Sequence, residues 1–91
     1  MTTPLHTIHS VAGLDRCLGR ATGEATLLLL EDGIYAALTS RVIPARAVYV
    51  LAEDLAARGL SPGDLAAGIT ALDIKGFVAL TVAHSPIVAW F

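Results

Sequence analysis

The stretch Ala25-Thr26-Leu27-Leu28-Leu29-Leu30, followed directly by Glu31-Asp32-Gly33, decides the fold. The first six residues have the length of a strand and are apolar except for Thr26. Such a run is expected where both faces of a strand are covered, as in a parallel sheet flanked by helices. Asp32 suits the N-cap of a short helix over Gly33–Leu38. The centre of the chain therefore predicts a buried strand followed at once by a helix.

The same alternation of strand and helix extends in both directions from this centre. Upstream, a short strand is expected at Leu5–Ile8 and a helix at Val11–Ala21, because apolar residues recur there at helical spacing. Downstream, the expected strands are Ala47–Ala52, Ile69–Leu72 and Ile87–Phe91, and the expected helices are Glu53–Arg58, one that begins at Ser61-Pro62-Gly63-Asp64, and Ile74–His84. This pattern predicts one α/β domain over residues 1–91, with four or five mostly parallel strands and helices on both faces.

The helix Ile74–His84 is unusually apolar. Asp73 is placed to cap it, and Lys75 is its single charged residue. A helix that is hydrophobic on every side is normally buried. We therefore expect this helix to be buried nearly all round.

Composition indicates that the chain has a protein partner. The chain has 91 residues, of which 55% are hydrophobic and only 15% charged. A domain of this size buries only about 60–65% of the surface of its unfolded chain. Some apolar side chains must therefore be covered by a second copy or by other subunits.

The number and spacing of charged residues argue against nucleic acid as a partner and against a membrane span. The net charge is −2, Lys75 is the only lysine, and no two basic residues are adjacent, which argues against direct nucleic-acid binding. The longest uncharged stretch, Gly76–Phe91, is too short to span a membrane. The N-terminus lacks the features of a secretory signal, and one cysteine forms no internal disulfide. We expect a cytoplasmic protein.

Several blocks of sequence resemble one family, the TusB/DsrH family of small sulfur-relay subunits. The resemblance spans nearly the whole chain and rests on Leu5-His6-Thr7-Ile8-His9, on Leu27-Leu28-Leu29-Leu30-Glu31-Asp32-Gly33-Ile34-Tyr35-Ala36-Ala37, on Val48-Tyr49-Val50-Leu51-Ala52-Glu53-Asp54-Leu55-Ala56-Ala57-Arg58-Gly59, and on Ala89-Trp90. It implies a DsrE-like three-layer fold. It also implies a dimer of heterotrimers, a heterohexamer formed with one DsrE- or TusD-like and one DsrF- or TusC-like subunit. In that complex the principal sulfur-accepting cysteine belongs to the DsrE/TusD-like chain, and no cofactor is implied.

Cys17 is the one candidate for sulfur chemistry in this chain. A thiol that accepts sulfur must react as the thiolate, which nearby positive charge favours. Arg16 is adjacent and Arg20 lies one helical turn later, so both are candidates for stabilising the thiolate, although Asp15 opposes them. The alternative interpretation is that Cys17 is a small buried residue on the apolar side of the helix. DsrH-type members resemble this chain in having a cysteine in the first helix, whereas TusB-type members generally lack it.

Polar residues at the carboxyl ends of the expected strands are the other candidates, since ligands of parallel sheets bind there. They are His9 and Ser10, Glu31–Gly33, Glu53 with Asp54, and Asp73. An acid–base pair is conceivable among the carboxylates, but each pair opens a helix, and capping is the simpler interpretation.

The histidines and the terminal aromatic residues have simpler interpretations. His6 and His9 are three residues apart and should face opposite sides of a strand, so with His84 they make a poor zinc signature, and no metal is expected. Hydrogen bonding to a persulfide remains a hypothesis for these two. Trp90 and Phe91 are expected to pack or to form an interface.

Three functions follow from these observations. The preferred one is a subunit of a heteromeric intracellular sulfurtransferase in dissimilatory sulfur oxidation, mainly an assembly subunit with a secondary persulfide-carrying thiol at Cys17. The first alternative is a TusB-like subunit of the sulfur relay that serves 2-thiolation of the wobble uridine in transfer RNA. The second is a structural or self-associating module without chemistry.

Overall fold

The structure, a computed structural model, describes residues 3–20, 23–38 and 42–91. Five parallel strands form one sheet in the order β4-β3-β2-β1-β5. The strands are β1 (Leu5–Ile8), β2 (Thr26–Leu29), β3 (Ala47–Leu51), β4 (Ile69–Leu72) and β5 (Ile87–Trp90). The helices are α1 (Val11–Leu18), the 3₁₀ helix η1 (Glu31–Leu38), α2 (Ala52–Ala57), the 3₁₀ turn η2 (Pro62–Asp64) and α3 (Ile74–Ala83). The predicted α/β class and parallel sheet are confirmed.

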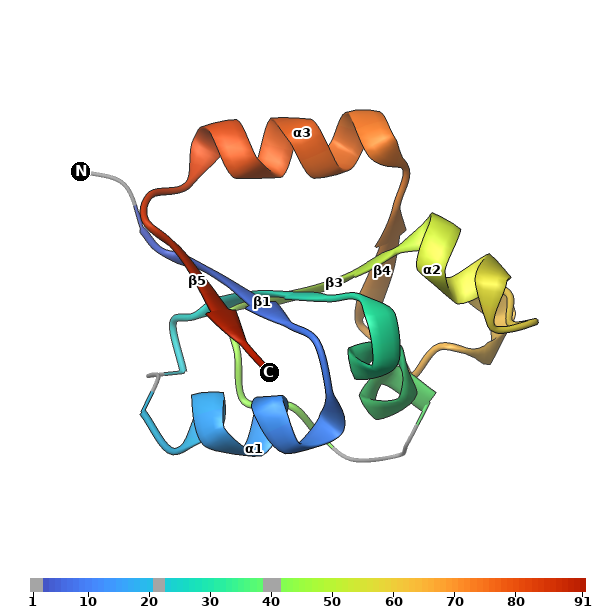
Figure 1. The fold of residues 1–91 in the computed structure, drawn as a ribbon, viewed down its shortest axis with the longest axis horizontal. Coiled ribbons are helices and arrows are strands. Elements are labelled where there is room, and N and C mark those ends of the chain that lie inside the picture. The colour runs from blue at the N-terminus through green and yellow to red at the C-terminus, as the bar shows by residue number, and fades with distance from the viewer. Residues whose placement is uncertain (1–2, 21–22, 39–41) are drawn as a thin grey trace.

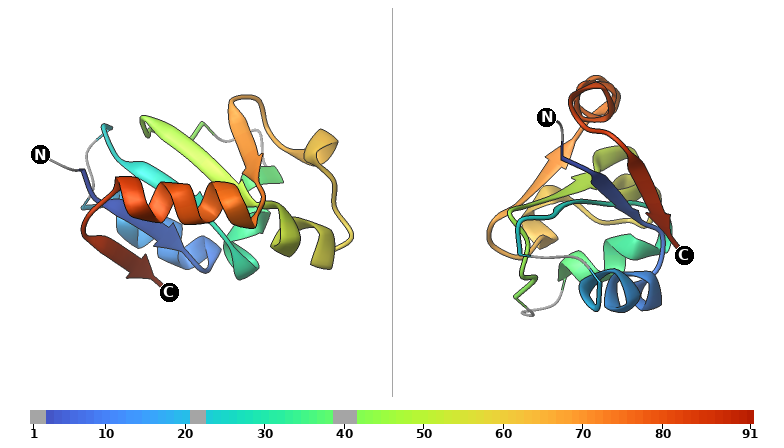
Figure 2. Two further views of the ribbon diagram at one scale, coloured as in Figure 1. Left: turned by 90° about the horizontal axis from the view of Figure 1, so that it is seen from above. Right: turned by 90° about the vertical axis from the view of Figure 1, so that its left-hand side faces the viewer.

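The elements form three layers. Helices α1 and η1 lie against one face of the sheet, and α3 crosses the other face from β4 to β5, as Figure 1 shows. The two further views in Figure 2 show α3 on the opposite side of the sheet from α1. The last connection, from β4 through α3 to β5, therefore joins the two opposite edges of the sheet.

The core is densest between the sheet and the layer of α1 and η1. All four residues of the central strand β2 are buried, as its apolar run predicted. Leu27 and Leu29 belong to a buried cluster that also holds Leu14 of α1 and Ile34 of η1. Because side chains alternate along a strand, Leu28 points to the opposite face, toward α3, and is also fully buried.

Two glycines allow helices to approach strand ends closely. A Cβ at Gly13 of α1 would stand 2.6 Å from the carbonyl oxygen of Trp90, which is below van der Waals contact. A Cβ at Gly33 of η1 would overlap the carbonyl oxygen of Ile8. Backbone atoms cannot move aside as a flexible side chain can, so both positions require glycine.

Several expected elements differ from the structure in extent, most of them by one residue at an end. The first helix ends at Leu18, where Gly19 caps it, although it was expected to continue to Ala21, which lies outside the described residues. The second begins at Glu31 as a 3₁₀ helix, so Asp32 is its second residue and does not cap it. The third ends at Ala57, one residue earlier than expected. The expected capping roles of Asp73 on α3 and of Asp64 at Ser61 are confirmed by hydrogen bonds of 2.8 Å to backbone N–H groups.

The expectation that the last helix is buried nearly all round is wrong for the chain by itself. No residue of α3 is buried, and Ile74, Val78 and Val82 are each more than half exposed. The physical reason is geometric: a single helix laid across a sheet can bury only the side that touches it.

Candidate functional site

The carboxyl ends of β1, β2 and β3 bring together three of the residues expected there. His9 follows β1, Glu31 follows β2, and Asp54 lies in the first turn of α2 after β3. Glu31 contacts the other two, through its side chain to His9 and through its backbone N–H to Asp54. Asp73, which follows β4, caps α3.

His9 is held on three sides. Its Nδ1 lies 2.9 Å from Oε1 of Glu31, and its Nε2 lies 3.0 Å from Oγ1 of Thr7. Its ring stacks on Phe91, with 4.3 Å between ring centroids and 19° between planes. A histidine between a hydroxyl and a carboxylate can in principle activate the hydroxyl. Here Thr7 is buried, so no substrate reaches it, and the contacts instead fix the ends of β1, β2 and β5 relative to one another.

Glu31 has an unusual backbone conformation. Its φ of 51° lies in the left-handed region, which residues other than glycine rarely adopt. Two hydrogen bonds hold it there, the side-chain contact to His9 and the 2.7 Å bond from its N–H to Oδ2 of Asp54. Backbone strain of this kind persists only where the surrounding structure imposes it.

Asp32, a further carboxylate at these strand ends, contacts a basic group of the same chain. Asp32 accepts a 3.0 Å hydrogen bond from Nη2 of Arg58, whose guanidinium lies 5.9 Å from the ring centroid of Tyr35. The hydrogen bond to Asp32 raises the pKa of Arg58, so the arginine stays charged. Glu31 and Asp32 lie in the first turn of η1, and Glu53 and Asp54 in that of α2, where carboxylates compensate the helix dipole. The N-terminus of α2 has no side-chain cap, so the expected capping role is wrong there. These contacts favour a structural role for the carboxylates over an acid–base pair.

Cys17 lies in the core. Its side chain belongs to the buried cluster with Leu14 and Leu27, and its exposed fraction is zero. Burial raises the pKa of the Cys17 thiol, which is opposite to the direction expected from Arg16 and Arg20. Both arginines are exposed. The structure thus places the thiol with the apolar residues and the two guanidinium-bearing residues at the surface.

His6 and His9 face opposite sides of the sheet, as their spacing predicted. Nδ1 of His6 accepts a 3.0 Å hydrogen bond from Nε1 of Trp90, and burial lowers the pKa of His6. His84 lies elsewhere, with its Nδ1 at 3.0 Å from the carbonyl oxygen of Thr3. Within the described residues, no group of three or more histidine, cysteine, aspartate or glutamate side chains is arranged to hold a metal ion.

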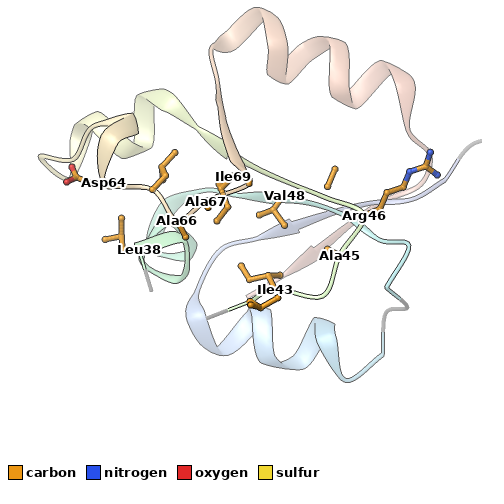
Figure 3. A pocket seen from close by; sticks show the side chains of 13 residues that line it. Leu38, Ile43, Ala45, Arg46, Val48, Asp64, Ala66, Ala67 and Ile69 are labelled. Carbon is orange, nitrogen blue, oxygen red and sulfur yellow. The ribbon is translucent and has the colours of Figure 1, made fainter. Parts of the chain in front are cut away.

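Sequence reasoning missed a groove at the amino ends of β3 and β4, the opposite end of the sheet from His9. Figure 3 shows this groove, whose volume is about 690 Å³. Apolar side chains such as Ile43, Val48 and Ile69 line it, with Arg46 and Asp64 among the lining residues. The pair Val42-Ile43, two large apolar residues outside any expected element, could have indicated an apolar surface there.

No helix among the described residues has both the length and the apolar character that crossing a bilayer requires.

Comparisons with known proteins identify the family of the chain. The family model described as "DsrH like protein" matches residues 9–87. The chain is also similar to proteins named "Protein TusB" from Escherichia coli O139:H28 (strain E24377A / ETEC), Escherichia coli O9:H4 (strain HS) and Shigella boydii serotype 18 (strain CDC 3083-94 / BS512). Each is 42% identical over 96 aligned residues, which cover 94% of this chain and 99% of the relative. The chain belongs to the TusB/DsrH family.

Proposed function

We propose that this chain is an assembly subunit of a heteromeric sulfur relay of the TusB type. The observation that carries the proposal is the 42% identity to proteins named TusB over 94% of the chain. This similarity favours the TusB alternative over the DsrH branch that Cys17 suggested from the sequence. The proposed companions are one TusD-like and one TusC-like subunit, in a dimer of heterotrimers.

The state of Cys17 supports an assembly role. The chain has one cysteine, and a sulfur acceptor needs an exposed thiol with a lowered pKa. Cys17 has neither property, because the core covers it and burial raises its pKa. In this proposal, the sulfur-accepting cysteine belongs to the TusD-like companion, and Cys17 packs α1 against the sheet.

The proposed product is 2-thiouridine at the wobble position of transfer RNA, made in the cytoplasm. This chain does not hold the RNA, since its net charge is −2 and phosphate binding needs clustered basic residues. Its proposed role is to stabilise the complex that transfers sulfur to an RNA-modifying partner.

Two measurements test this function. Co-expression of the chain with the TusC-like and TusD-like proteins of the same organism should yield one complex that co-purifies through a tag on any member. Deletion of the gene should remove 2-thiouridine from hydrolysed transfer RNA, and the Cys17→Ala variant should restore it. Unchanged 2-thiouridine in the deletion strain, with impaired growth on reduced sulfur compounds, would instead support a role in sulfur oxidation.

Cys17 itself supports a second candidate, a secondary persulfide carrier in sulfur oxidation. Its support is the cysteine in the first helix, the DsrH-type feature, with Arg16 on the same helix and Arg20 two residues beyond its end. Incubation of the assembled complex with a persulfide donor should then add the mass of one sulfur atom to this chain, and Cys17→Ser should abolish the addition. Labelling of the companion subunits without labelling of this chain removes Cys17 from the relay.

A further inference from the structure

The last part of the chain contributes little to the core. Between residues 73 and 91, a range that includes α3 and β5, no residue is buried. In β5, exposed and partly exposed residues alternate. Segments with few buried apolar contacts open at a lower free energy than the rest of a fold. The α3–β5 segment, residues 73–91, is therefore suited to detach locally while the sheet stays folded.

Among the strands, β5 pairs only with β1. It is the last strand in the sheet order, and its four residues pair with Leu5–Ile8, as Figure 1 shows. One backbone hydrogen bond of 3.0 Å joins Leu5 to Pro86, and another of 2.9 Å joins His9 to Trp90. A short pairing of two strands is only marginally stable by itself. Side-chain contacts near the end of β5 therefore affect whether it stays paired.

Two histidines contact the aromatic residues Trp90 and Phe91. Nδ1 of His6 accepts a 3.0 Å hydrogen bond from Nε1 of Trp90, and the two ring centroids are 6.1 Å apart. The ring of His9 stacks on Phe91, with 4.3 Å between centroids. These contacts join the last two residues of the α3–β5 segment to β1 and to the residue that follows it.

The contact between His6 and Trp90 requires a neutral imidazole ring. A neutral ring that accepts a hydrogen bond at Nδ1 carries its proton on Nε2. A second proton occupies Nδ1 and leaves no acceptor for the N–H of Trp90. Histidine is the side chain that ordinarily changes charge between about pH 5 and pH 8. Mild acid therefore replaces this hydrogen bond with two N–H groups that face each other.

The charged groups on the same side of the sheet do not compensate a charge on His6. The neighbouring strands β2 and β5 contain no charged residue. On α1, which covers this side, Asp15 and Arg16 are exposed and opposite in charge. On η1, Glu31 and Asp32 contact other basic side chains. Burial lowers the pKa of His6, in agreement with surroundings that favour the neutral ring.

We propose that His6 is an acid-sensitive latch for the α3–β5 segment: protonation of its ring breaks the hydrogen bond from Trp90 and releases β5 from β1, while the other strands stay paired. A proton that binds the released form more readily than the attached form shifts the equilibrium toward release. His9 differs from His6, because the carboxylate of Glu31 lies 2.9 Å from its Nδ1 and can pair with a charged ring. Release is a property of the chain alone and requires no companion subunit.

Hydrogen exchange, measured by mass spectrometry on the full chain at about pH 7.5 and about pH 5, tests the latch. Exchange rates are first corrected for the direct effect of pH on amide chemistry. We expect the protection of β5 amides to fall roughly fivefold at the acid pH, the equivalent of one lost hydrogen bond. Amides of β2 serve as the internal reference and should keep their protection. The fluorescence of Trp90, the only tryptophan, should shift toward longer wavelength over the same pH range.

The same substitution at each histidine identifies the group that titrates. His6→Gln removes the titrating ring, so the protection of β5 should be the same at both pH values. His84→Gln is the matched control, since His84 immediately follows α3 and lies three residues before β5. His9→Gln controls for the contact with Phe91. Both control variants should keep the pH response of the unaltered chain.

Each result supports or overturns the latch. Equal protection of β5 at both pH values in the unaltered chain would overturn it. A parallel loss of protection in β2 would do so as well, because it would show unfolding of the whole domain. A pH response that persists in His6→Gln, or disappears in His9→Gln or His84→Gln, would assign the titration to another group. The chain has three histidines, so a response that survives in both control variants supports His6 even if His6→Gln does not fold.

Discussion

The burial of Cys17 could be predicted only in part from its neighbours in the sequence. The spacing from Leu14 placed the cysteine on or beside the apolar stripe of the first helix, and the structure puts both in one buried cluster. Arg16 and Arg20 suggested an activated thiolate. Adjacent helical residues such as Arg16 and Cys17 point in different directions, and Arg20 lies beyond the end of α1. Whether a thiol at the border of an apolar stripe is covered depends on residues distant in sequence, such as Leu27 of the next strand.

Substitution of Cys17 should reveal its packing role. We expect Cys17→Ala to cost about 1–2 kcal/mol of unfolding free energy, from lost contacts and a small cavity. Cys17→Ser should cost about as much or more, because a buried hydroxyl needs a hydrogen-bond partner. Urea unfolding, followed by circular dichroism, measures both. A Cys17→Ser chain as stable as the original would contradict the buried position of the thiol.

Gly33 should be intolerant of any side chain. Gly33→Ala is expected to cost about 1–3 kcal/mol, because its methyl group would overlap the carbonyl oxygen of Ile8, an atom of the rigid central sheet. Gly23→Ala is the matched control, since a Cβ there meets no atom within 4 Å. Comparison of the two melting temperatures checks this prediction. Equal melting temperatures would show that η1 can move away from β1 at little cost.

At the scale of elements, most of the fold was predictable because the apolar periodicity is strong. The buried strand β2, the alternation of strands and helices, and the cap at Asp73 all follow from local sequence. The 3₁₀ form of η1 was not predictable, since it depends on the hydrogen bonds that hold Glu31 at positive φ. The burial of α3 was predicted wrongly, because periodicity reports that a helix is apolar but not which chain covers it.

The stability of the folded chain should depend on pH through His6 of β1, which accepts a hydrogen bond from Trp90 of β5. Burial lowers the pKa of His6 in the folded chain, so protons bind the unfolded chain more readily. Stability should therefore be unaffected above the unfolded pKa of about 6.5 and should fall as the pH drops below it, until the folded pKa is passed. The protonated ring also cannot accept the hydrogen bond from Nε1 of Trp90.

Tryptophan fluorescence can isolate this effect, because Trp90 is the only tryptophan. The His6→Gln variant has no titrating group at this position. The urea concentrations at the unfolding midpoints of the original chain and of this variant should differ at neutral pH and become similar at acid pH. A constant difference across this pH range would show that His6 does not link stability to pH.

At the scale of the whole molecule, the sequence indicated a partner and the structure shows where apolar area is left uncovered. The excess of hydrophobic residues is a property of composition, so it was visible without a fold. The location on α3 and β5 was not, because it follows from the crossing of one helix over five strands. The cluster of His9, Glu31 and Asp54 was predicted as a set of strand ends, but the contacts among its members required the structure.

Companion subunits should raise the thermal stability of this chain. A partner that binds only the folded form stabilises it in proportion to the logarithm of partner concentration over the dissociation constant. At a partner concentration one hundred times the dissociation constant this amounts to about 2.7 kcal/mol, or about 11–22 °C in a domain of this size. Differential scanning fluorimetry of the chain with and without purified companions measures the shift. An unchanged melting temperature would argue against stable assembly.

The uncharged segment from Gly76 to Phe91 also has a consequence for the cell that makes this protein. A chain synthesised before its companions exposes an unpaired edge strand and an apolar helix, and other polypeptides can bind to both. Chaperones bind such unassembled chains and proteases degrade them. Balanced synthesis of all members of the complex would then govern how much of this protein accumulates, more than the strength of its own promoter.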